Sequence, residues 1–196
     1  MINTAHPALP SPNPHRIWLV GAGGAGCNII ERVKTQALRV AANYEWPRAD
    51  TPGITRLTMP APMQESPFRT SASVLALANQ WRPAFTEACQ GITSWPEQLH
   101  LISGWGGTGL ALVRLFFESA PVTTAVVLWQ LAPFCFEDHQ RAMSILEKII
   151  DIRPDVQLKT LPNDPRKGRE KISLLDLLTQ LNKHHAATIG SALKIL

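Results

Sequence analysis

Two glycine-rich segments of the sequence could hold an anion. The first, GAGGAGCN, occupies Gly21–Asn28 and follows the short apolar run Ile17–Val20. The second, GWGGTG, occupies Gly104–Gly109 and follows the apolar run Leu99–Ser103. Glycine lets the backbone approach a ligand closely, and the amides at the start of a following helix favour a phosphate. Each segment therefore predicts a strand, a glycine turn and a helix, with phosphate binding as its chemistry.

Other phosphate-binding motifs fit the first segment less well. A Walker A loop ends in Gly-Lys-Ser/Thr, whereas this segment ends in Cys27-Asn28. A dinucleotide-binding fold places an acidic residue about 20 positions further on, at the tip of a second strand. Glu45 and Asp50 lie near that distance, but we find no apolar strand in front of Glu45. Two glycine segments at the carboxyl ends of parallel strands could instead wrap a chain of phosphates from two sides, with tight packing as the alternative.

The elements that would position these segments alternate along the chain. Besides the two runs above, we expect strands at Val122–Trp129 and Val156–Thr160, and an edge strand within Ile54–Met59. The predicted helices are Asn28–Ala42, Ser71–Gln90 with a possible break at Pro83, Thr108–Glu118, Glu137–Ile150 and Ser173–Leu193. This alternation predicts an α/β fold, a three-layer αβα Rossmann-like domain with a mostly parallel sheet.

Length and composition fit one globular domain. The chain has 196 residues, of which 45% are hydrophobic and 17% charged. We expect residues 1–15 to form a flexible proline-rich arm, residues 16–196 to form the single domain, and residues 44–70 to form a long proline-rich loop. We see neither a secretory signal nor a run of about 20 apolar residues that could span a bilayer, and we therefore predict a cytoplasmic protein with no membrane partner.

The cysteines and the net charge give little further information about function. Cys27, Cys89 and Cys135 are far apart and show no zinc-binding spacing, which fits buried thiols in a reducing compartment. The net charge is +4, and the most basic stretch, Lys159–Lys171, carries no aromatic residues for base stacking. We interpret it as a solvated loop and keep nucleic acid only as a lesser alternative.

The pair of glycine segments resembles the FtsZ/tubulin family of polymerising GTPases. That family's first loop reads G-x-G-G-x-G-x-N, which Gly21–Asn28 matches at every fixed position. Its signature G-G-G-T-G-T/S-G is matched by Gly106–Ala111, one glycine short and with alanine last. The resemblance implies the fold of the family's N-terminal GTPase domain. It implies phosphate contacts by Gly21, Ala22, Gly23, Gly24, Ala25, Gly26, Asn28, Gly104, Gly106, Gly107, Thr108 and Gly109.

Three further stretches agree with the family in order. Leu131–Arg141 resembles P-F-x-F-E-G-x-x-R, Leu161–Asp164 resembles I-P-N-D, and Ile172–Asn182 resembles the start of the family's central helix, expected over about residues 172–195. The resemblance implies ribose contacts by Pro133, Glu137 and Arg141. It implies base contacts by Asn28, Asn163, Leu178 and Asn182.

The chain also departs from the family. Leu178 stands where the family has an aromatic ring on guanine, and Lys183 stands at a position that reads the guanine edge. An ammonium donates hydrogen bonds where guanine needs an acceptor, so another base is an alternative. The family's N-T-D segment after the second strand is not recognisable between Ala41 and Ala61.

The resemblance implies bound GTP or GDP, with or without Mg²⁺. Because the sequence ends at Leu196, where the family's acidic catalytic loop and second domain begin, we expect no C-terminal domain and no efficient self-contained GTP hydrolysis. We expect a bacterial cytoskeletal or cell-division type assembly module, acting on itself as a dimer or on a full-length FtsZ/tubulin-like partner. The alternatives are a degenerate scaffold without nucleotide, a plasmid or mobile-element DNA segregation factor, and a nicotinamide-dependent oxidoreductase.

Overall fold

The computed structural model describes residues 16–44, 51–63, 70–90, 94–133, 139–163 and 174–193. Within these ranges the chain forms a six-stranded sheet in the order β3-β2-β1-β4-β5-β6, with every neighbouring pair parallel. The strands are β1 Ile17–Ala22, β2 Leu38–Asn43, β3 Ile54–Thr58, β4 Gln98–Ser103, β5 Ala125–Leu131 and β6 Gln157–Leu161. The helices are α1 Gly23–Ile30, α2 Ser71–Gln90, α3 Gly107–Ser119, α4 His139–Ile150 and α5 Leu174–Leu193. The predicted α/β class is confirmed.

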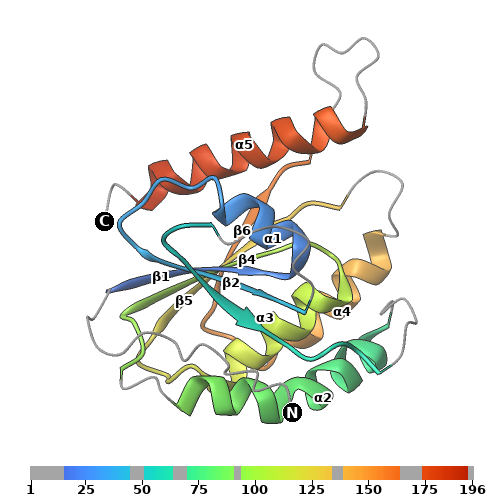
Figure 1. The fold of residues 1–196 in the computed structure, drawn as a ribbon. Helices are drawn as coiled ribbons and strands as arrows, with labels where there is room; N and C mark the ends of the chain where they lie inside the picture. The colour runs from blue at the N-terminus through green and yellow to red at the C-terminus, as the bar shows by residue number, and fades with distance from the viewer. Residues whose placement is uncertain are drawn as a thin grey trace, which may run out of the picture.

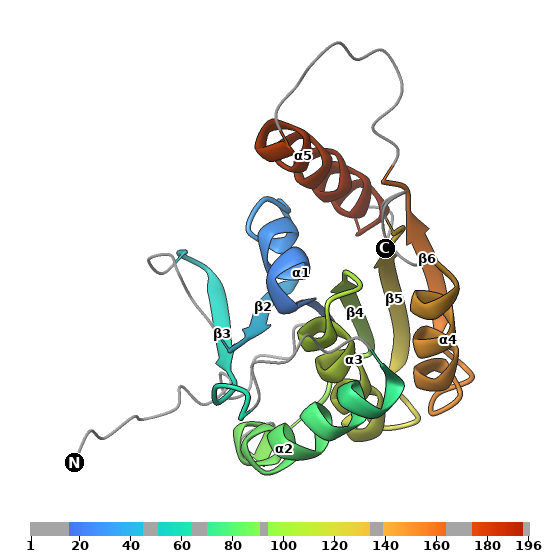
Figure 2. The ribbon, with the colours of Figure 1, turned by 90° about the vertical axis from the view of Figure 1, so that its right-hand side faces the viewer.

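Helices cover both faces of the sheet. Helices α1 and α5 lie on one face, and α2, α3 and α4 lie on the other (Figure 1). Seen from the side, β3 and β6 form the two edges of the sheet (Figure 2). On the first face, Leu19 of β1, Ile102 of β4 and Ile189 of α5 belong to one buried apolar cluster. Phe85 and Phe116 meet edge to face on the second, with ring centroids 4.9 Å apart. These two apolar layers account for the burial of the central strands β1, β4 and β5 on both sides.

The order of the strands reverses between β1 and β4. The chain moves from β1 outward to β2 and β3, then returns to pair β4 with the other side of β1. At their carboxyl ends, Ala22 of β1 pairs with Ser103 of β4. Crevices that bind ligands in open parallel sheets form outside the carboxyl ends of the strands at such a switch point. Both glycine-rich segments begin there.

The helix predicted over Asn28–Ala42 was wrong. Helix α1 already ends at Ile30, and Leu38–Asn43 forms β2 between β1 and β3. Short apolar runs fit helical and strand periodicity equally well. Here Leu38–Asn43 forms a strand because it can pair with the edge of β1. A strand therefore does precede Glu45, contrary to our reason for setting the dinucleotide interpretation aside, although Glu45 itself lies outside the described residues.

The remaining elements agree with the predictions apart from their ends. The edge strand predicted within Ile54–Met59 is β3. Helix α2 continues through Pro83 without a break. It is capped by Thr70, whose Oγ1 accepts a hydrogen bond from the Ser73 amide at 3.1 Å.

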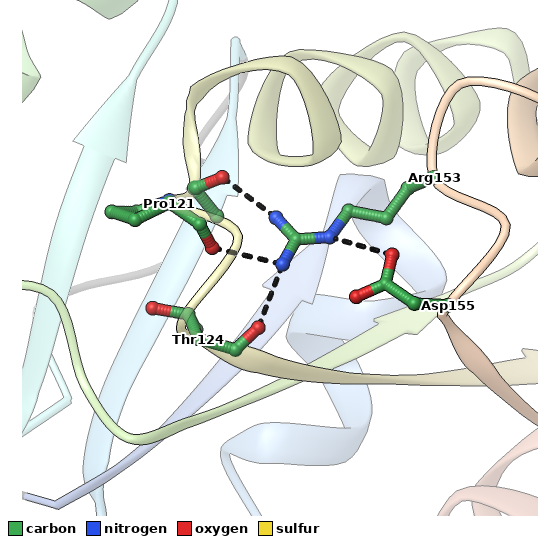
Figure 3. Close-up of polar contacts among 5 residues, drawn as sticks. Pro121, Thr124, Arg153 and Asp155 are labelled. Carbon is green, nitrogen blue, oxygen red and sulfur yellow. Dashed lines mark hydrogen bonds and ion pairs between the residues drawn. The ribbon is translucent and has the colours of Figure 1, made fainter.

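Arg153 explains why β5 starts later than predicted. Its guanidinium is buried and donates to the carbonyl oxygens of Ala120, Pro121 and Thr124, at 2.6, 2.8 and 2.7 Å (Figure 3). Its Nε also contacts Asp155 Oδ1 at 3.2 Å. These bonds hold the α3–β5 connection in a turn, so the strand begins only at Ala125. These contacts lie at the amino edge of the sheet, which is opposite to the carboxyl edge where the two glycine segments lie.

Candidate functional site

The two glycine segments lie against each other. Gly23 has a φ of +69°, and a Cβ there would lie 2.8 Å from the backbone nitrogen of Gly109. A Cβ on Gly109 would lie 2.9 Å from the carbonyl oxygen of Ala22 and 2.7 Å from Ser103 Oγ. Real Cβ atoms do not come this close to backbone atoms, so only glycine allows the two backbones to meet. The start of α1 and the start of α3 therefore share one place on the carboxyl edge.

The first segment is shorter as a loop than we predicted. Gly21 and Ala22 are the last residues of β1, and α1 begins at Gly23. A Cβ on Gly21 would lie 2.6 Å from the carbonyl carbon of Gly26, and one on Gly26 would collide with the carbonyl oxygen of Ile102. These two glycines are needed for the packing of α1 onto β1 and β4. The packing alternative therefore explains part of the pattern.

At two other glycines of these segments an added Cβ would have open space. Gly24 in α1 and Gly106 before α3 are exposed, and a Cβ at either position would meet nothing within 4 Å. Neither has a positive φ. A site for a ligand that approaches the backbone is one reason for a glycine where the protein itself leaves space. One such position lies on each segment.

The first turns of α1 and α3 have amides that no cap side chain satisfies. The cap residues Ala22 and Gly106 have extended backbones and no side-chain oxygen to accept from the first-turn N–H groups. Neither first turn carries an acidic residue. By contrast, α2 has its Thr70 cap. Two uncapped helix starts without acids form a place where an anion is favoured.

The bulky Trp105 does not cover this place. Its side chain is half-buried and packs against the hydrophobic core that α2, α3 and α4 share with the sheet. Its Nε1 is buried without a hydrogen-bond partner in the described part of the chain. The Trp105 side chain thus packs into the core, and the neighbouring Gly106 stays exposed.

The segments expected to contact ribose follow β5. Ser103 of β4 pairs with Gln130 of β5, which brings the end of β5 beside the second glycine segment. Pro133 comes two residues after β5 and is half-buried. Arg141 is an exposed residue of the first turn of α4, while Glu137 lies outside the described residues. Proximity of Pro133 and Arg141 to a ribose stays a prediction.

The residues expected to contact the base come from three elements. Leu178 and Asn182 are half-buried and lie one turn apart on α5, while Asn28 is half-buried in α1. Helix α5 packs toward α1, with Ala186 and Ile189 of α5 in the same apolar cluster as Ile29 and Ile30 of α1. The amide of Asn163, after β6, bonds to Ala132 and His185. Base contacts by these residues stay predictions.

Lys183 lies in a basic part of the surface. It is exposed and lines a hollow of about 330 Å³ together with Arg32 and Lys34, over a floor of small residues on α5. Arg32 is engaged twice, since it donates to the carbonyl oxygen of Asn28 and lies 4.0 Å from a carboxylate oxygen of Glu31. With Glu31 offsetting part of the Arg32 charge, Lys34 and Lys183 still make the region next to Asn182 electropositive, which favours an anionic ligand over a neutral one.

Comparisons with known proteins now bear on this arrangement. No family model matches the chain, and no curated protein matches it significantly. Among solved structures, CetZ from Methanosaeta thermophila strain DSM 6194 matches with a TM-score of 0.66 and 16% identity, over 91% of this chain and 54% of that one. TubZ of Clostridium botulinum phage c-st, with its C-terminal tail truncated, matches with a TM-score of 0.64 and 14% identity, over 91% and 60%.

The fold is that of the tubulin/FtsZ GTPase domain. A second TubZ structure agrees, with a TM-score of 0.63 and 14% identity over 91% of this chain and 59% of that one. The chain thus spans less than two thirds of the length of these proteins. At such low identity the tubulin-like likeness concerns the fold, and the chain is a divergent example of it. The resemblance seen in the glycine segments is confirmed at this level.

Two searches within the described ranges bear on other ligands. They contain no helix long and apolar enough to cross a bilayer. They also contain no group of three or more His, Cys, Asp or Glu residues placed to hold a metal ion.

Sequence reasoning missed one residue of this region. His185 is buried in α5 and contacts Asn163, yet in the sequence it is one of two adjacent histidines on a predicted helix. Two buried apolar residues of α5, Leu181 and Ile189, lie four positions before and four positions after it, about one helical turn in each direction. That spacing is the signal that could have placed His185 on the buried face.

Proposed function

We propose that this chain binds the phosphates of a nucleotide between the starts of α1 and α3. The observation that supports this most strongly is the pair Gly24 and Gly106, which are exposed, adjoin two uncapped helix starts and face no protein atom where a Cβ would be. The amides of Gly24, Ala25 and Gly107 would donate to phosphate oxygens, and Thr108 would add a hydroxyl. Electrostatic attraction to the two helix starts would hold the anion.

We further propose GTP or GDP as the ligand. The tubulin/FtsZ GTPase fold and the matching first segment support a guanine nucleotide. Its ribose would lie near Pro133 and Arg141, and its base between Asn28 and the Leu178–Asn182 face of α5. Leu178 covers a base face through dispersion only, because it lacks a π-system, so we expect weaker base contacts than an aromatic residue provides.

A segment that the sequence left unassigned fits this proposal. Strand β2 ends at Asn43, so Asn43 and Tyr44 lie where the family's N-T-D segment follows the second strand. Asn43 is held at the carboxyl edge by its carbonyl, which accepts from the Met59 amide at 2.9 Å. We propose that this segment forms the third side of the phosphate site, next to the end of β1.

The role of the nucleotide would be to control assembly. We propose that residues 16–196 act as one nucleotide-binding unit that associates with a second copy or with a tubulin-like partner, as the fold suggests. Sedimentation with and without GTP tests this. Nucleotide-dependent pelleting, alone or with an FtsZ, is expected, and unchanged sedimentation in both cases would contradict it.

A scaffold without nucleotide is the second candidate. It is favoured by the glycines at 21, 23, 26 and 109, which packing alone explains. Equilibrium titration with fluorescent GTP, GDP and ATP separates the two candidates. Micromolar binding of any of them supports the nucleotide site, and its absence at millimolar concentration leaves the scaffold.

A further inference from the structure

A buried histidine joins three parts of the proposed nucleotide site. His185 of α5 is fully buried, and its Nε2 lies 3.1 Å from Oδ1 of Asn163. Nδ2 of Asn163 donates to the carbonyl oxygen of Ala132 at 2.5 Å. Ala132 follows β5, and Asn163 comes two residues after β6. The chain of contacts therefore runs from α5 through the end of β6 to the end of β5.

These contacts fix which way the Asn163 amide points. The carbonyl of Ala132 can only accept, so the NH₂ group of Asn163 must face it. Oδ1 then faces His185, which must donate from Nε2–H. Reversing the amide would place oxygen against oxygen at Ala132 and N–H against N–H at His185. His185 Nδ1 is consequently an acceptor, and it has no partner among the described residues.

A fixed amide can read a ligand. The two contacts use one of the two N–H groups of Asn163 and one of the two lone pairs of its oxygen. Asn163 is half-buried, so the rest of the amide is within reach of a ligand at the carboxyl edge. One N–H beside one lone pair complements a nucleobase edge that presents an acceptor next to a donor. A freely flipping amide would not discriminate between such edges.

The position of His185 on α5 adds a second consequence. It lies three residues after Asn182 and seven after Leu178, on the same face of the helix. Pro133 directly follows Ala132. The histidine thus ties the helix that carries the expected base contacts to the segment that carries the expected ribose contacts.

We propose that His185 is a positioning residue that orients the Asn163 amide for recognition of a nucleobase and holds α5 against the ends of β5 and β6. The inference rests on the proposed nucleotide function. It assigns His185 a part in base selection and none in phosphate binding.

The test compares His185→Leu, which removes the donor, with His185→Gln, which keeps an N–H at a similar reach. Affinities for GDP, ADP and UDP are measured by calorimetry, with inorganic tripolyphosphate as the base-free probe. We expect His185→Leu to lower the affinity for the tightest nucleotide about tenfold and to reduce its preference over the other two, since a hydrogen bond of this kind is worth about 1.4 kcal/mol. Tripolyphosphate binding should not change, and His185→Gln should retain most of the affinity. The exposed neighbour provides the matched control, His184→Leu.

A double-variant cycle shows whether His185 acts through Asn163. In an Asn163→Ala background, His185→Leu should cause no further loss. An equal further loss, a uniform loss that includes tripolyphosphate, or no effect of His185→Leu on nucleotide binding would overturn the proposal.

The histidine contact can also be tested without any ligand. Nitrogen-15 NMR of the wild-type protein should show the neutral Nε2–H tautomer for His185, and the Nδ1–H tautomer would overturn the proposal even if His185→Leu fails to fold. If wild type binds tripolyphosphate but no nucleotide preferentially, base recognition fails while the phosphate site stands. If wild type binds none of the four probes, the proposed function itself fails, and the positioning role fails with it.

Discussion

Gly23 of α1 and Gly109 of α3 bring two helix starts together at the point where the strand order reverses. A Cβ on Gly23 would lie only 2.8 Å from the Gly109 nitrogen. The contact joins segments that are far apart in the chain, and it turns two separate strand–helix junctions into one site. Each junction alone is compatible with simple packing. Their contact directs two sets of uncapped amides to one place, which is what an anion requires.

Substitutions at the glycines distinguish a role in packing from a role in ligand binding. We predict that Gly24→Ala and Gly106→Ala fold as wild type, because a Cβ at either position meets no protein atom within 4 Å. Gly24→Ala should even be slightly more stable, since alanine favours a helix by up to about 1 kcal/mol over glycine. Both variants should lose nucleotide affinity at least tenfold, because the Cβ enters the space of the ligand. Thermal unfolding and nucleotide titration measure the two effects.

The matched control is Gly21→Ala, whose Cβ would lie 2.6 Å from Gly26. This variant should be destabilised by several kcal/mol or fail to fold, as overpacking against backbone does. Full nucleotide affinity in both Gly24→Ala and Gly106→Ala would show that the open glycines do not face a ligand.

Cys27 offers a probe inside the first glycine segment. Its Sγ is buried and lies 3.3 and 3.5 Å from the carbonyl oxygens of Gly21 and Ala42, which share its single S–H donor. Burial raises the pKa of this thiol to about 12, so it should react with Ellman's reagent only after local opening. In a Cys89→Ser/Cys135→Ser protein, bound nucleotide should slow the reaction further by stabilising the closed segment. A fast reaction that nucleotide does not change would contradict this placement.

Two buried histidines predict how stability depends on pH. Burial lowers the pKa of His100 and of His185 to about 4, with the charges of Lys159 and His184 as smaller contributions. Between the ordinary value of 6.5 and about 4, the unfolded chain binds protons that the folded chain does not. The free energy of unfolding should therefore fall as the pH drops below 6.5 and stay level just above it.

Urea midpoints near neutral pH and at about pH 5 measure this fall, before most carboxylates protonate. His185→Gln should make the pH dependence shallower, and His184→Gln, at an exposed position, should leave it nearly unchanged. A midpoint that rises on acidification would refute the assignment of buried neutral histidines.

Arg153 should matter for stability and not for binding. Arg153→Ala removes a donor from the carbonyl oxygens of Ala120, Pro121 and Thr124, of which Pro121 still accepts from the Thr124 amide, and we expect a loss of about 3 kcal/mol. Asp155→Asn should cost no more than about 1 kcal/mol, because the Asp155 side chain is 57% exposed. Nucleotide affinity should be the same in both variants, since the Arg153 contacts lie at the amino edge of the sheet, away from the proposed site. Equal stability of the two variants by urea unfolding would contradict a stabilising role for the Arg153 hydrogen bonds.

The parts of the fold that the sequence could predict were those with strong local signals. The strand–glycine–helix junctions at Gly21–Asn28 and Gly104–Gly109 carry turn residues, apolar runs and helical periodicity together, and the structure has both. The edge strand near Ile54 and helix α2 were predicted for the same reason. Such agreement between local pattern and global fold is typical of elements whose sequence has no competing alternative.

Other features depend on contacts between distant residues. Leu38–Asn43 is a strand only because β1 has a free edge beside it, which periodicity over fifteen residues does not reveal. The start of β5 depends on Arg153, which lies 29 positions after Thr124 in the chain. The His185–Asn163 contact joins residues 22 positions apart. Distinguishing glycines that pack from glycines that stay open also requires coordinates, because both look identical in a motif.

The most direct test of the nucleotide site is an equilibrium titration of the wild-type protein and Gly24→Ala with fluorescent GTP and GDP. We predict a dissociation constant in the micromolar range or below for wild type, competition by unlabelled nucleotide, and at least tenfold weaker binding to an equally stable Gly24→Ala. Saturation of neither nucleotide by wild type at millimolar concentration, or equal affinity of the two proteins, would contradict the placement of phosphates between α1 and α3.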